Sequence, residues 1–231
     1  MSYFRKLGIF VKVPKLGHVK TRLVPPLANE DACQLYDAFL RDLFNRLNKL
    51  KKVDVTVFFT GGDDPSTLQE FAPSRFRFVA QAGRDLGQRL SSAFAQLLAD
   101  EGDAAVIIGS DSPDLPLTFV KRAFLKLKRK DVVLGPASDG GYYLVGLNRL
   151  RGELFSGPAW GSETVLAETL EIIRSHSLSC SILPLWYDVD DAHTLALLRT
   201  MLLGRQIERR DRLHHTERAL KQILERGRVK G

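Results

Sequence analysis

A cluster of cationic side chains without acidic neighbours lies close to the N-terminus. Lys12, Lys15, Lys20 and Arg22 fall within eleven residues, and no acidic residue precedes position 30. Several fixed positive charges in one segment suit a polyphosphate, whose negative charge has to be neutralised before a nucleophile can attack it. The segment is not a Walker A loop, because Val19 stands where that motif has a glycine before its lysine. We expect this segment to bind phosphates, and the alternative is a solvated basic loop.

Two aspartates follow an apolar segment in the middle of the chain. Asp111 comes three residues after Ile108, and Asp114 follows three residues later. Mg²⁺ and Mn²⁺ prefer oxygen ligands, and Mg²⁺ is commonly held by one or two carboxylates together with substrate phosphates. Asp111 is therefore a candidate metal ligand. In the alternative interpretation one aspartate forms an Asx turn and the other caps the following helix, and capping is the role that we expect for Asp114.

A second acidic segment ends the last predicted core strand. Asp188, Asp190 and Asp191 follow the aromatic pair Trp186-Tyr187. Either Asp188 or Asp190 could supply another carboxylate to a metal ion. In the alternative interpretation this segment has a structural role, and Asp191 caps the helix that begins directly after it.

Two further polar segments contain glycines. Gln81, Gly83, Asp85, Gly87 and Arg89 share one loop, in which glycines four residues apart let the backbone approach a flat ligand such as a base or a ribose. A turn followed by a helix that Asp85 caps explains these residues equally well.

The other glycine-containing segment is a tight turn. Asp139, Gly140 and Gly141 lie there between two predicted strands. Their carboxylate and amides could face an acceptor molecule, and the alternative is an ordinary hairpin turn.

Strands that alternate with helices must position these segments. The strands expected from β-branched and apolar runs are 7–13, 53–59, 76–80, 104–109, 132–134, 142–147 and 181–186. The helices expected from apolar spacing are 29–50, a helix through 90–98, 117–129, 162–175 and 191–203. This alternation predicts an α/β fold of three layers, α/β/α, around a mostly parallel central sheet. Ligands of such sheets bind beyond the carboxyl ends of the strands, where the polar segments lie.

Length and composition limit the other possibilities. The chain has 231 residues, of which 44% are hydrophobic and 26% charged, as in ordinary globular proteins. No apolar run is long enough to predict a membrane span. Cys33 and Cys180 stand far apart, and the histidines show no helical metal pairing, so zinc and iron–sulfur sites are not expected. The apolar N-terminal segment is too short for a signal peptide, and we expect a cytoplasmic protein.

The C-terminal residues 204–231 are expected to form a basic amphipathic helical extension of a domain over residues 1–203. Residues 205–231 contain nine Lys/Arg and four Asp/Glu, a difference of five charges out of the net +7. Leu213, Leu220 and Ile223 follow near-helical spacing. Nucleic-acid binding through this segment is the weaker alternative, because no recognition motif accompanies the charge.

Four motifs occur in a fixed order along the chain. They are Lys12-x-Pro14-x-x-Gly17-x-x-Lys20-Thr21-Arg22-Leu23, Gly109-Ser110-Asp111-Ser112-Pro113, Pro136-x-x-Asp139-Gly140-Gly141-Tyr142-Tyr143 and Asp188-Val189-Asp190. Together they resemble the bacterial DUF2064 family, a glycosyltransferase-like family with the GT-A, or nucleotide-diphospho-sugar transferase, fold. The first motif is also similar to that of 2-phospholactate guanylyltransferases. The resemblance covers about residues 6–200, and it departs from the related late motif, which continues Asp-Thr-Pro, at Asp191-Ala192.

The resemblance implies a transferase that depends on Mg²⁺ (or Mn²⁺) and acts on a nucleotide or sugar nucleotide. Lys20, Arg22 and Asp139 would be catalytic, the two cations at the leaving group and the aspartate at the acceptor. The residues expected at the nucleotide are Lys12, Lys15, Gly17, Gln81, Gly83, Asp85, Gly87 and Arg89. The metal would be held by Asp111 and Asp190, and the acceptor by Asp114, Gly140 and Gly141.

Two reactions share this machinery, nucleotidyl transfer from a nucleoside triphosphate and glycosyl transfer from a sugar nucleotide, and both stay open. The expected partners are a nucleotide or sugar nucleotide and an unidentified small-molecule acceptor. The alternative function is a non-catalytic nucleotide-binding or partner-binding protein of the same fold. The sequence does not determine the oligomeric state.

Overall fold

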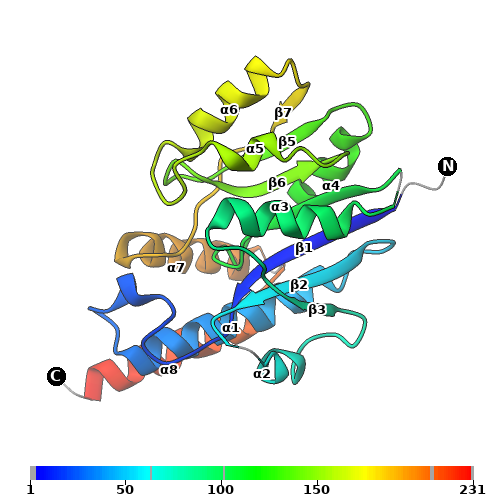
Figure 1. Cartoon of the computed structure of the whole chain (residues 1–231). Coiled ribbons are helices and arrows are strands. Elements are labelled where there is room, and N and C mark those ends of the chain that lie inside the picture. The colour runs from blue at the N-terminus through cyan, green and yellow to red at the C-terminus, as the bar shows by residue number, and fades with distance from the viewer. Residues whose placement is uncertain (1–3, 63, 101, 209–210, 230–231) are drawn as a thin grey trace.

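A seven-stranded sheet organises the chain (Figure 1). The computed structural model describes residues 4–62, 64–100, 102–208 and 211–229. Their strands are β1 (Arg5–Lys12), β2 (Asp54–Thr60), β3 (Arg77–Ala80), β4 (Ala104–Ile108), β5 (Val132–Pro136), β6 (Tyr142–Leu147) and β7 (Cys180–Ile182). The strand order is β3-β2-β1-β4-β6-β5-β7, and only β6 runs antiparallel to its neighbours β4 and β5. The mostly parallel sheet expected from the sequence is confirmed.

Helices cover both faces of the sheet. They are α1 (Asn29–Leu47), α2 (Ser66–Gln69), α3 (Leu86–Leu97), α4 (Leu117–Leu127), α5 (Glu153–Ser156), α6 (Val165–Ser175), α7 (Ala192–Ile207) and α8 (His214–Val229), with a 3₁₀ turn, η1, at Thr21–Leu23. Residues of α1, α4, α7 and α8 share one hydrophobic core with the sheet, and residues of α3, α5 and α6 share the other. These three layers match the α/β/α expectation. None of the described helices is both long and apolar enough to cross a membrane.

The central strands are buried because helices pack on both of their faces. Every residue of β4 is buried, and β1 buries Leu7, Ile9 and Val11 toward α1 and α4. On its other face, β1 has Gly8, where an added Cβ would lie 2.9 Å from Ile107 Cγ1. This close packing explains why the strand sequences are nearly continuous apolar runs.

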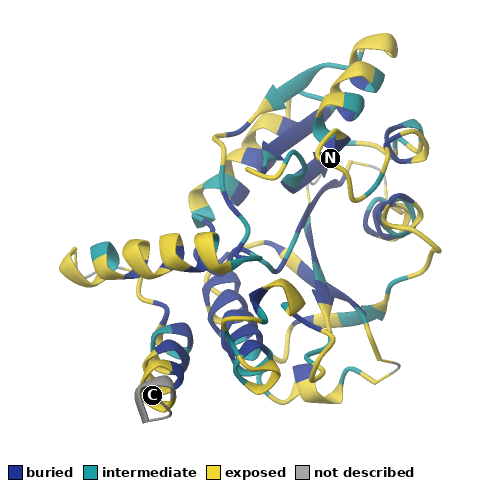
Figure 2. Ribbon diagram, turned by 90° about the vertical axis from the view of Figure 1, so that its left-hand side faces the viewer, coloured by how far each residue is buried: buried dark blue, intermediate teal, exposed yellow. Residues whose placement is uncertain are grey.

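The C-terminal helix α8 packs against α1 of the same chain (Figure 2). Helix α7 continues to Ile207, four residues beyond the end of the expected helix 191–203. Asp42 of α1 accepts hydrogen bonds from the amides of His215 (3.2 Å) and Thr216 (2.7 Å), and so satisfies donors at the first turn of α8. The leucines predicted to form the apolar face of this segment, Leu213 and Leu220, are buried. Arg209, Arg210 and Lys230, which contribute to its predicted charge, lie outside the described residues.

Most expected elements are present, and the differences are local. The last strand is shorter than the expected 181–186, because only Cys180–Ile182 pairs with β5 and Trp186 forms a single bridge to Ala137. The helices α2 and α5, each four residues long, were not expected. The caps given as alternatives for Asp85 and Asp191 are present, whereas the expected cap Asp114 is wrong: α4 begins after Pro116 without a side-chain cap.

Candidate functional site

The basic segment after β1 brings Lys20 into the interior of the molecule. Lys20 has φ 49° and ψ 38°, a left-handed conformation that is uncommon for a residue other than glycine. Its side chain is only 3% exposed, although neighbouring Thr21 and Arg22 are exposed. An unfavourable backbone conformation of this kind persists only where surrounding contacts hold it.

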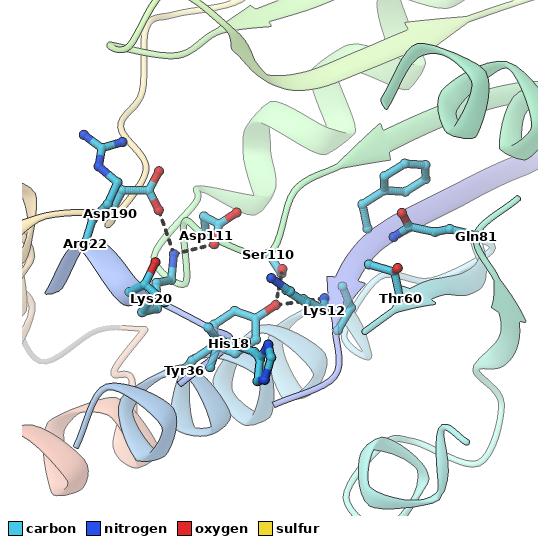
Figure 3. Close-up of a pocket in the computed structure, with 14 residues that line it drawn as sticks. Lys12, His18, Lys20, Arg22, Tyr36, Thr60, Gln81, Ser110, Asp111 and Asp190 are labelled. Carbon is cyan, nitrogen blue, oxygen red and sulfur yellow. Dashed lines mark hydrogen bonds and ion pairs between the residues drawn. The ribbon is translucent and has the colours of Figure 1, made fainter. Parts of the chain in front are cut away.

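Those contacts come from two aspartates (Figure 3). The Lys20 ammonium donates to Asp190 Oδ1 at 3.0 Å and also to Asp111 Oδ1. It lies 5.6 Å from the ring centroid of Tyr36 and 5.9 Å from that of Phe39, both on α1. Burial alone would lower the pKa of Lys20, but the charges of Asp111 and Asp190 outweigh it and raise the pKa above its usual value. Lys20 is therefore a fixed cation held by two carboxylates.

Tyr36 links the segments that follow β1 and β4. Its hydroxyl accepts a hydrogen bond from the Lys12 amide (3.1 Å) and lies 2.8 Å from Ser110 Oγ. Burial, together with the charge of Asp111, raises the pKa of Tyr36 to about 12, so the hydroxyl stays protonated. The late acidic segment joins the same group, because the amide of Val189 donates to the backbone oxygen of Asp111 (2.9 Å). The segments that follow β1 and β4 thus meet the late acidic segment beyond the carboxyl ends of the strands, as expected for an open α/β sheet.

A cavity of about 330 Å³ opens at this meeting point (Figure 3). Its lining residues are Phe10, Val11, Lys12, His18, Val19, Lys20, Thr21, Arg22, Tyr36, Thr60, Gln81, Ser110, Asp111 and Asp190. The structure therefore brings together Lys12, Lys20, Arg22, Gln81 and the two aspartates of the predicted site. Lys12 and Arg22 are exposed, so their charges are available to a ligand.

A second cavity of about 730 Å³ adjoins the first and shares Arg22 and Asp190 with it. Asp139 and Asp188 also line it. Asp188 accepts a hydrogen bond from Ser112 Oγ, and burial together with the charge of Asp111 raises its pKa to about 7. Asp190 contacts Lys20, whereas Asp188 accepts from Ser112. The sequence had left open which of the two would be a metal ligand.

The carboxylates of Asp111 and Asp190 fit a divalent cation that binds together with substrate phosphates. Asp111 and Asp190 both reach one ammonium nitrogen, so both can face one cation, and their side chains are 44% and 35% exposed. The described residues contain no group of three or more His, Cys, Asp or Glu side chains placed to hold a metal ion. Two carboxylates completed by substrate phosphates are a common arrangement for Mg²⁺.

Several predicted nucleotide-binding residues have contacts elsewhere. Lys15 and Gly17 are exposed and are not among the described residues that line the cavity. Arg89 donates to the backbone oxygen of Gly83 (3.1 Å), and Asp85 accepts from the amide of Gln88 (2.8 Å). A Cβ on Gly87 would lie 2.2 Å from the backbone oxygen of Phe155, so this glycine allows α3 to approach α5.

The residues predicted to contact the acceptor likewise do not all lie at one site. Asp114 is fully buried, and its carboxylate accepts from the hydroxyl of Tyr187 (2.7 Å) and the indole of Trp186 (3.3 Å). Asp114 therefore supports Trp186 and Tyr187, two residues that line the second cavity. Asp139 lines that cavity and accepts from the amide of Gly141 (3.0 Å). Gly140 has φ 90°, and a Cβ there would lie 2.0 Å from the backbone oxygen of Glu163.

Sequence reasoning missed five polar residues of the first cavity. They are His18, Thr21, Tyr36, Thr60 and Ser110. His18, Thr21 and Ser110 stand inside segments that the sequence had singled out, so their positions gave a signal. Tyr36 lies on the buried face of a helix, where a tyrosine indicates core packing. Thr60 lies at the end of a strand, where a threonine indicates strand pairing. Neither residue type in such a place signals a ligand site.

Known proteins resemble this chain in sequence. A model of the family described as "Uncharacterized protein conserved in bacteria (DUF2064)" matches residues 42–162. The 2-phospho-L-lactate guanylyltransferase of Methanothermobacter thermautotrophicus is 30% identical over 138 residues, which are 59% of this chain and 59% of that relative. The resemblance drawn from the motifs is thereby confirmed.

Solved structures show the same fold. A protein of Desulfovibrio desulfuricans G20, described as a candidate nucleotide-diphospho-sugar transferase, is 33% identical, with a TM-score of 0.86 over 96% of this chain and 97% of that one. A 4-diphosphocytidyl-2C-methyl-D-erythritol synthase is 12% identical, with a TM-score of 0.54 over 87% of this chain and 99% of that one. The chain therefore has the nucleotide-diphospho-sugar transferase fold.

Proposed function

This chain belongs to the DUF2064 family, and from that premise we propose that it is a Mg²⁺-dependent transferase that acts on a nucleotide or a sugar nucleotide. The observation that carries the proposal is the contact of one buried ammonium, Lys20 Nζ, with both Asp111 and Asp190 beside a cavity lined by further cations. A diphosphate needs such a mixture of cations and metal-binding carboxylates, because charge builds up on it as it leaves.

The cations of the first cavity have different roles in this proposal. Lys12 and Arg22 are exposed and bind the incoming phosphates. Lys20 is held in place by its two aspartates and stabilises the negative charge on the leaving group. A cation that is already in place costs no reorganisation when the reaction occurs, which is the basis of electrostatic catalysis.

Asp111 and Asp190 would hold the Mg²⁺ ion through the carboxylate oxygens that remain exposed beside Lys20. When bound, the ion neutralises and orients the phosphates. The nucleotide supplies its other ligands, because the described residues offer no third carboxylate arranged with these two as a metal site. We therefore expect Mg²⁺ to bind weakly alone and tightly with the nucleotide.

Nucleotidyl transfer is the first candidate reaction, and the relative named as a guanylyltransferase supports it. An acceptor hydroxyl attacks the α-phosphorus, so that an oxygen–phosphorus bond forms. The bond from the α-phosphorus to the bridging oxygen breaks, and pyrophosphate leaves with its electron pair. Asp139, at the second cavity, orients the acceptor and takes the proton of its hydroxyl.

Glycosyl transfer is the second candidate, supported by the 33% identical structure described as a candidate nucleotide-diphospho-sugar transferase. The acceptor oxygen would then attack the anomeric carbon, and a nucleoside diphosphate would leave. The same cations and carboxylates would hold the same diphosphate. The two reactions differ in which bond to it is broken.

Labelled substrates distinguish these reactions. The protein is incubated with Mg²⁺ and each of the four nucleoside triphosphates, and separately with UDP- and GDP-sugars, in the presence of mixed small-molecule acceptors. Release of pyrophosphate identifies nucleotidyl transfer, and release of a nucleoside diphosphate identifies glycosyl transfer. If calorimetry finds no binding of either nucleotide class with Mg²⁺, the proposed function is wrong.

A non-catalytic nucleotide-binding protein is the remaining candidate. It predicts nucleotide binding without turnover for every acceptor, and an Asp111→Asn variant that changes only the affinity. A transferase predicts that this variant loses turnover even when nucleotide saturates it.

A further inference from the structure

The second cavity combines two kinds of surface. The apolar side chains of its lining are Leu185, Trp186, Leu197 and Met201, called here the apolar wall. The acidic side chains are Asp139, Asp188, Asp190 and Asp191, called here the acidic wall, and Arg22 is shared with the first cavity. At about 730 Å³ this cavity is larger than the first, which has about 330 Å³.

Three of the four residues of the apolar wall lie outside the folded core, whereas Trp186 packs against it. Leu185 is 62% exposed, Leu197 38% and Met201 37%. None of the three belongs to either hydrophobic cluster or packs as a partly buried neighbour against one. Exposed apolar side chains that gather beside a reactive centre indicate a binding surface, because covering them removes apolar area from water. Figure 2 shows the C-terminal helices carrying exposed residues over much of their surface.

The acidic wall disfavours a negatively charged ligand in this cavity. Arg22 lies 3.8 Å from Asp191, and Lys20 is bound by Asp190 and Asp111. Asp139 has no ion-pair partner within the described part of the chain; it accepts only the Gly141 amide among the hydrogen bonds found there. An anionic occupant would meet these carboxylates at short range and be repelled, whereas a hydroxyl can donate to them.

We propose that the second cavity binds the acceptor of the transfer reaction, and that this acceptor is an uncharged or amine-bearing alcohol with an apolar chain or ring. This inference rests on the proposed function and narrows it, because it excludes phosphorylated and carboxylated acceptors. The apolar part lies against Leu197 and Met201. The hydroxyl lies near Asp139, toward the boundary formed by Arg22 and Asp190, where the two cavities meet.

The first experiment uses a pair of probes that share one apolar skeleton. Binding of 4-phenylbutan-1-ol and of 4-phenylbutanoate is measured by saturation-transfer NMR, with the full chain at neutral pH. The alcohol is expected to bind at least about 10-fold more tightly than the carboxylate. Butane-1,4-diol, which lacks the ring, is expected to show no measurable binding. Equal binding of alcohol and carboxylate, or absence of binding by the alcohol, overturns the proposal.

Matched variants on α7 locate the probe. Met201→Glu places a charge in the cavity wall, and Leu203→Glu places one on the same helix outside it, where Leu203 is 58% exposed. Met201→Glu is expected to weaken 4-phenylbutan-1-ol binding at least about 10-fold and Leu203→Glu to leave it unchanged. Leu197→Glu provides a second cavity variant if Met201→Glu does not fold. Equal effects of the cavity and control variants overturn the proposal.

Nucleotide binding is measured on the same samples, so that this inference and the proposed function can fail separately. Calorimetry with GTP and Mg²⁺ should give the same affinity for wild type, Met201→Glu and Leu203→Glu. If the nucleotide binds but the alcohol does not, the acceptor assignment is wrong and the transferase proposal stands. If no nucleoside triphosphate or sugar nucleotide binds, the proposed function is wrong.

A second copy of the chain is the other possible occupant of the apolar wall. Sedimentation velocity over a 100-fold concentration range tests it. A monomer, or a dimer that Met201→Glu leaves intact, agrees with the acceptor assignment. A dimer that Met201→Glu dissociates, and that 4-phenylbutan-1-ol does not affect, shows that the wall is a subunit interface and overturns the assignment.

Discussion

Lys20 and Asp190 stand 170 positions apart in the sequence, yet the ammonium and the carboxylate meet at 3.0 Å. The same ammonium binds Asp111, which is 91 positions from Lys20. A buried lysine would ordinarily lose its proton more easily, and the two aspartates reverse that tendency. This three-residue group joins the predicted phosphate-binding segment to the predicted metal ligands, and the predictions below start from it.

Replacing Lys20 should abolish most turnover. Lys20→Met removes a fixed cation from the predicted leaving-group site, and we expect about a 100- to 1000-fold loss of turnover at saturating nucleotide. Lys15→Met is the matched control, because Lys15 carries the same charge in the same segment but is exposed outside the cavity lining. Steady-state kinetics of the two variants provide the measurement. Equal losses would show that the segment acts only through its total charge.

Asp111 and Asp114 should behave differently although they stand three residues apart. Asp111→Asn removes a partly exposed predicted metal ligand that also pairs with the buried Lys20, so turnover should fall at least about 100-fold and the free energy of unfolding should fall by about 1–3 kcal/mol. Asp114→Asn brings an amide donor to the buried Tyr187 hydroxyl and Trp186 indole, and should cost about 2 kcal/mol of unfolding free energy.

Urea unfolding and turnover per folded molecule separate these effects. We expect Asp114→Asn to keep near-normal turnover below its unfolding transition. A stable Asp114→Asn protein without activity would instead place Asp114 in direct contact with substrate.

Gly87→Ala should reduce stability and leave nucleotide affinity unchanged. The added Cβ would overlap the backbone oxygen of Phe155 at 2.2 Å, and relief of this overlap should cost about 1–3 kcal/mol. Gly152→Ala is the control, because a Cβ there meets no atom within 4 Å. Thermal unfolding measures the first effect and calorimetry with Mg²⁺ and nucleotide the second. Weaker nucleotide binding by a fully folded Gly87→Ala protein would support the backbone-approach interpretation of this loop.

Asp211 should make stability depend on pH in acid solution. Burial alone would raise its pKa, but the hydrogen bond from Arg46 (2.7 Å) and the charges of Arg46 and Arg205 lower it below the usual value. A carboxyl with a lowered pKa stabilises the folded state at pH above its unfolded pKa, about 3.9, and loses that effect as pH falls through the folded value. Because the Asp211 side chain is 37% exposed and solvent screens its charge, Asp211→Asn should cost about 1 kcal/mol at pH 7 and much less below pH 3.

Chemical unfolding at a series of pH values checks this linkage. Glu225→Gln is the control, because Glu225 forms an exposed pair with Lys221 and should change stability by less than about 0.5 kcal/mol. A cost of Asp211→Asn that stays constant from pH 7 to pH 3 would show that the ionised carboxylate is not what stabilises the contact between α1 and the segment before α8.

The sequence by itself determined the layers of the fold and the places of the strands along the chain. Apolar runs of strand length and helical spacing depend on which face of each element is buried, and that is a local property of the sequence. The caps Asp85 and Asp191 are equally local, since each bonds to an amide three residues away in its own helix. For the same reason the polar segments could be assigned to the carboxyl ends of strands.

The tertiary structure alone decided which of those polar residues meet. Lys20 reaches Asp111 and Asp190 because β1 lies beside β4 and the late acidic segment pairs with the backbone of Asp111. Asp114 and Gly87 fit the same patterns, yet they pack against Tyr187 and Phe155. Strand order and helix packing arise from many contacts between distant residues, and no short motif contains them.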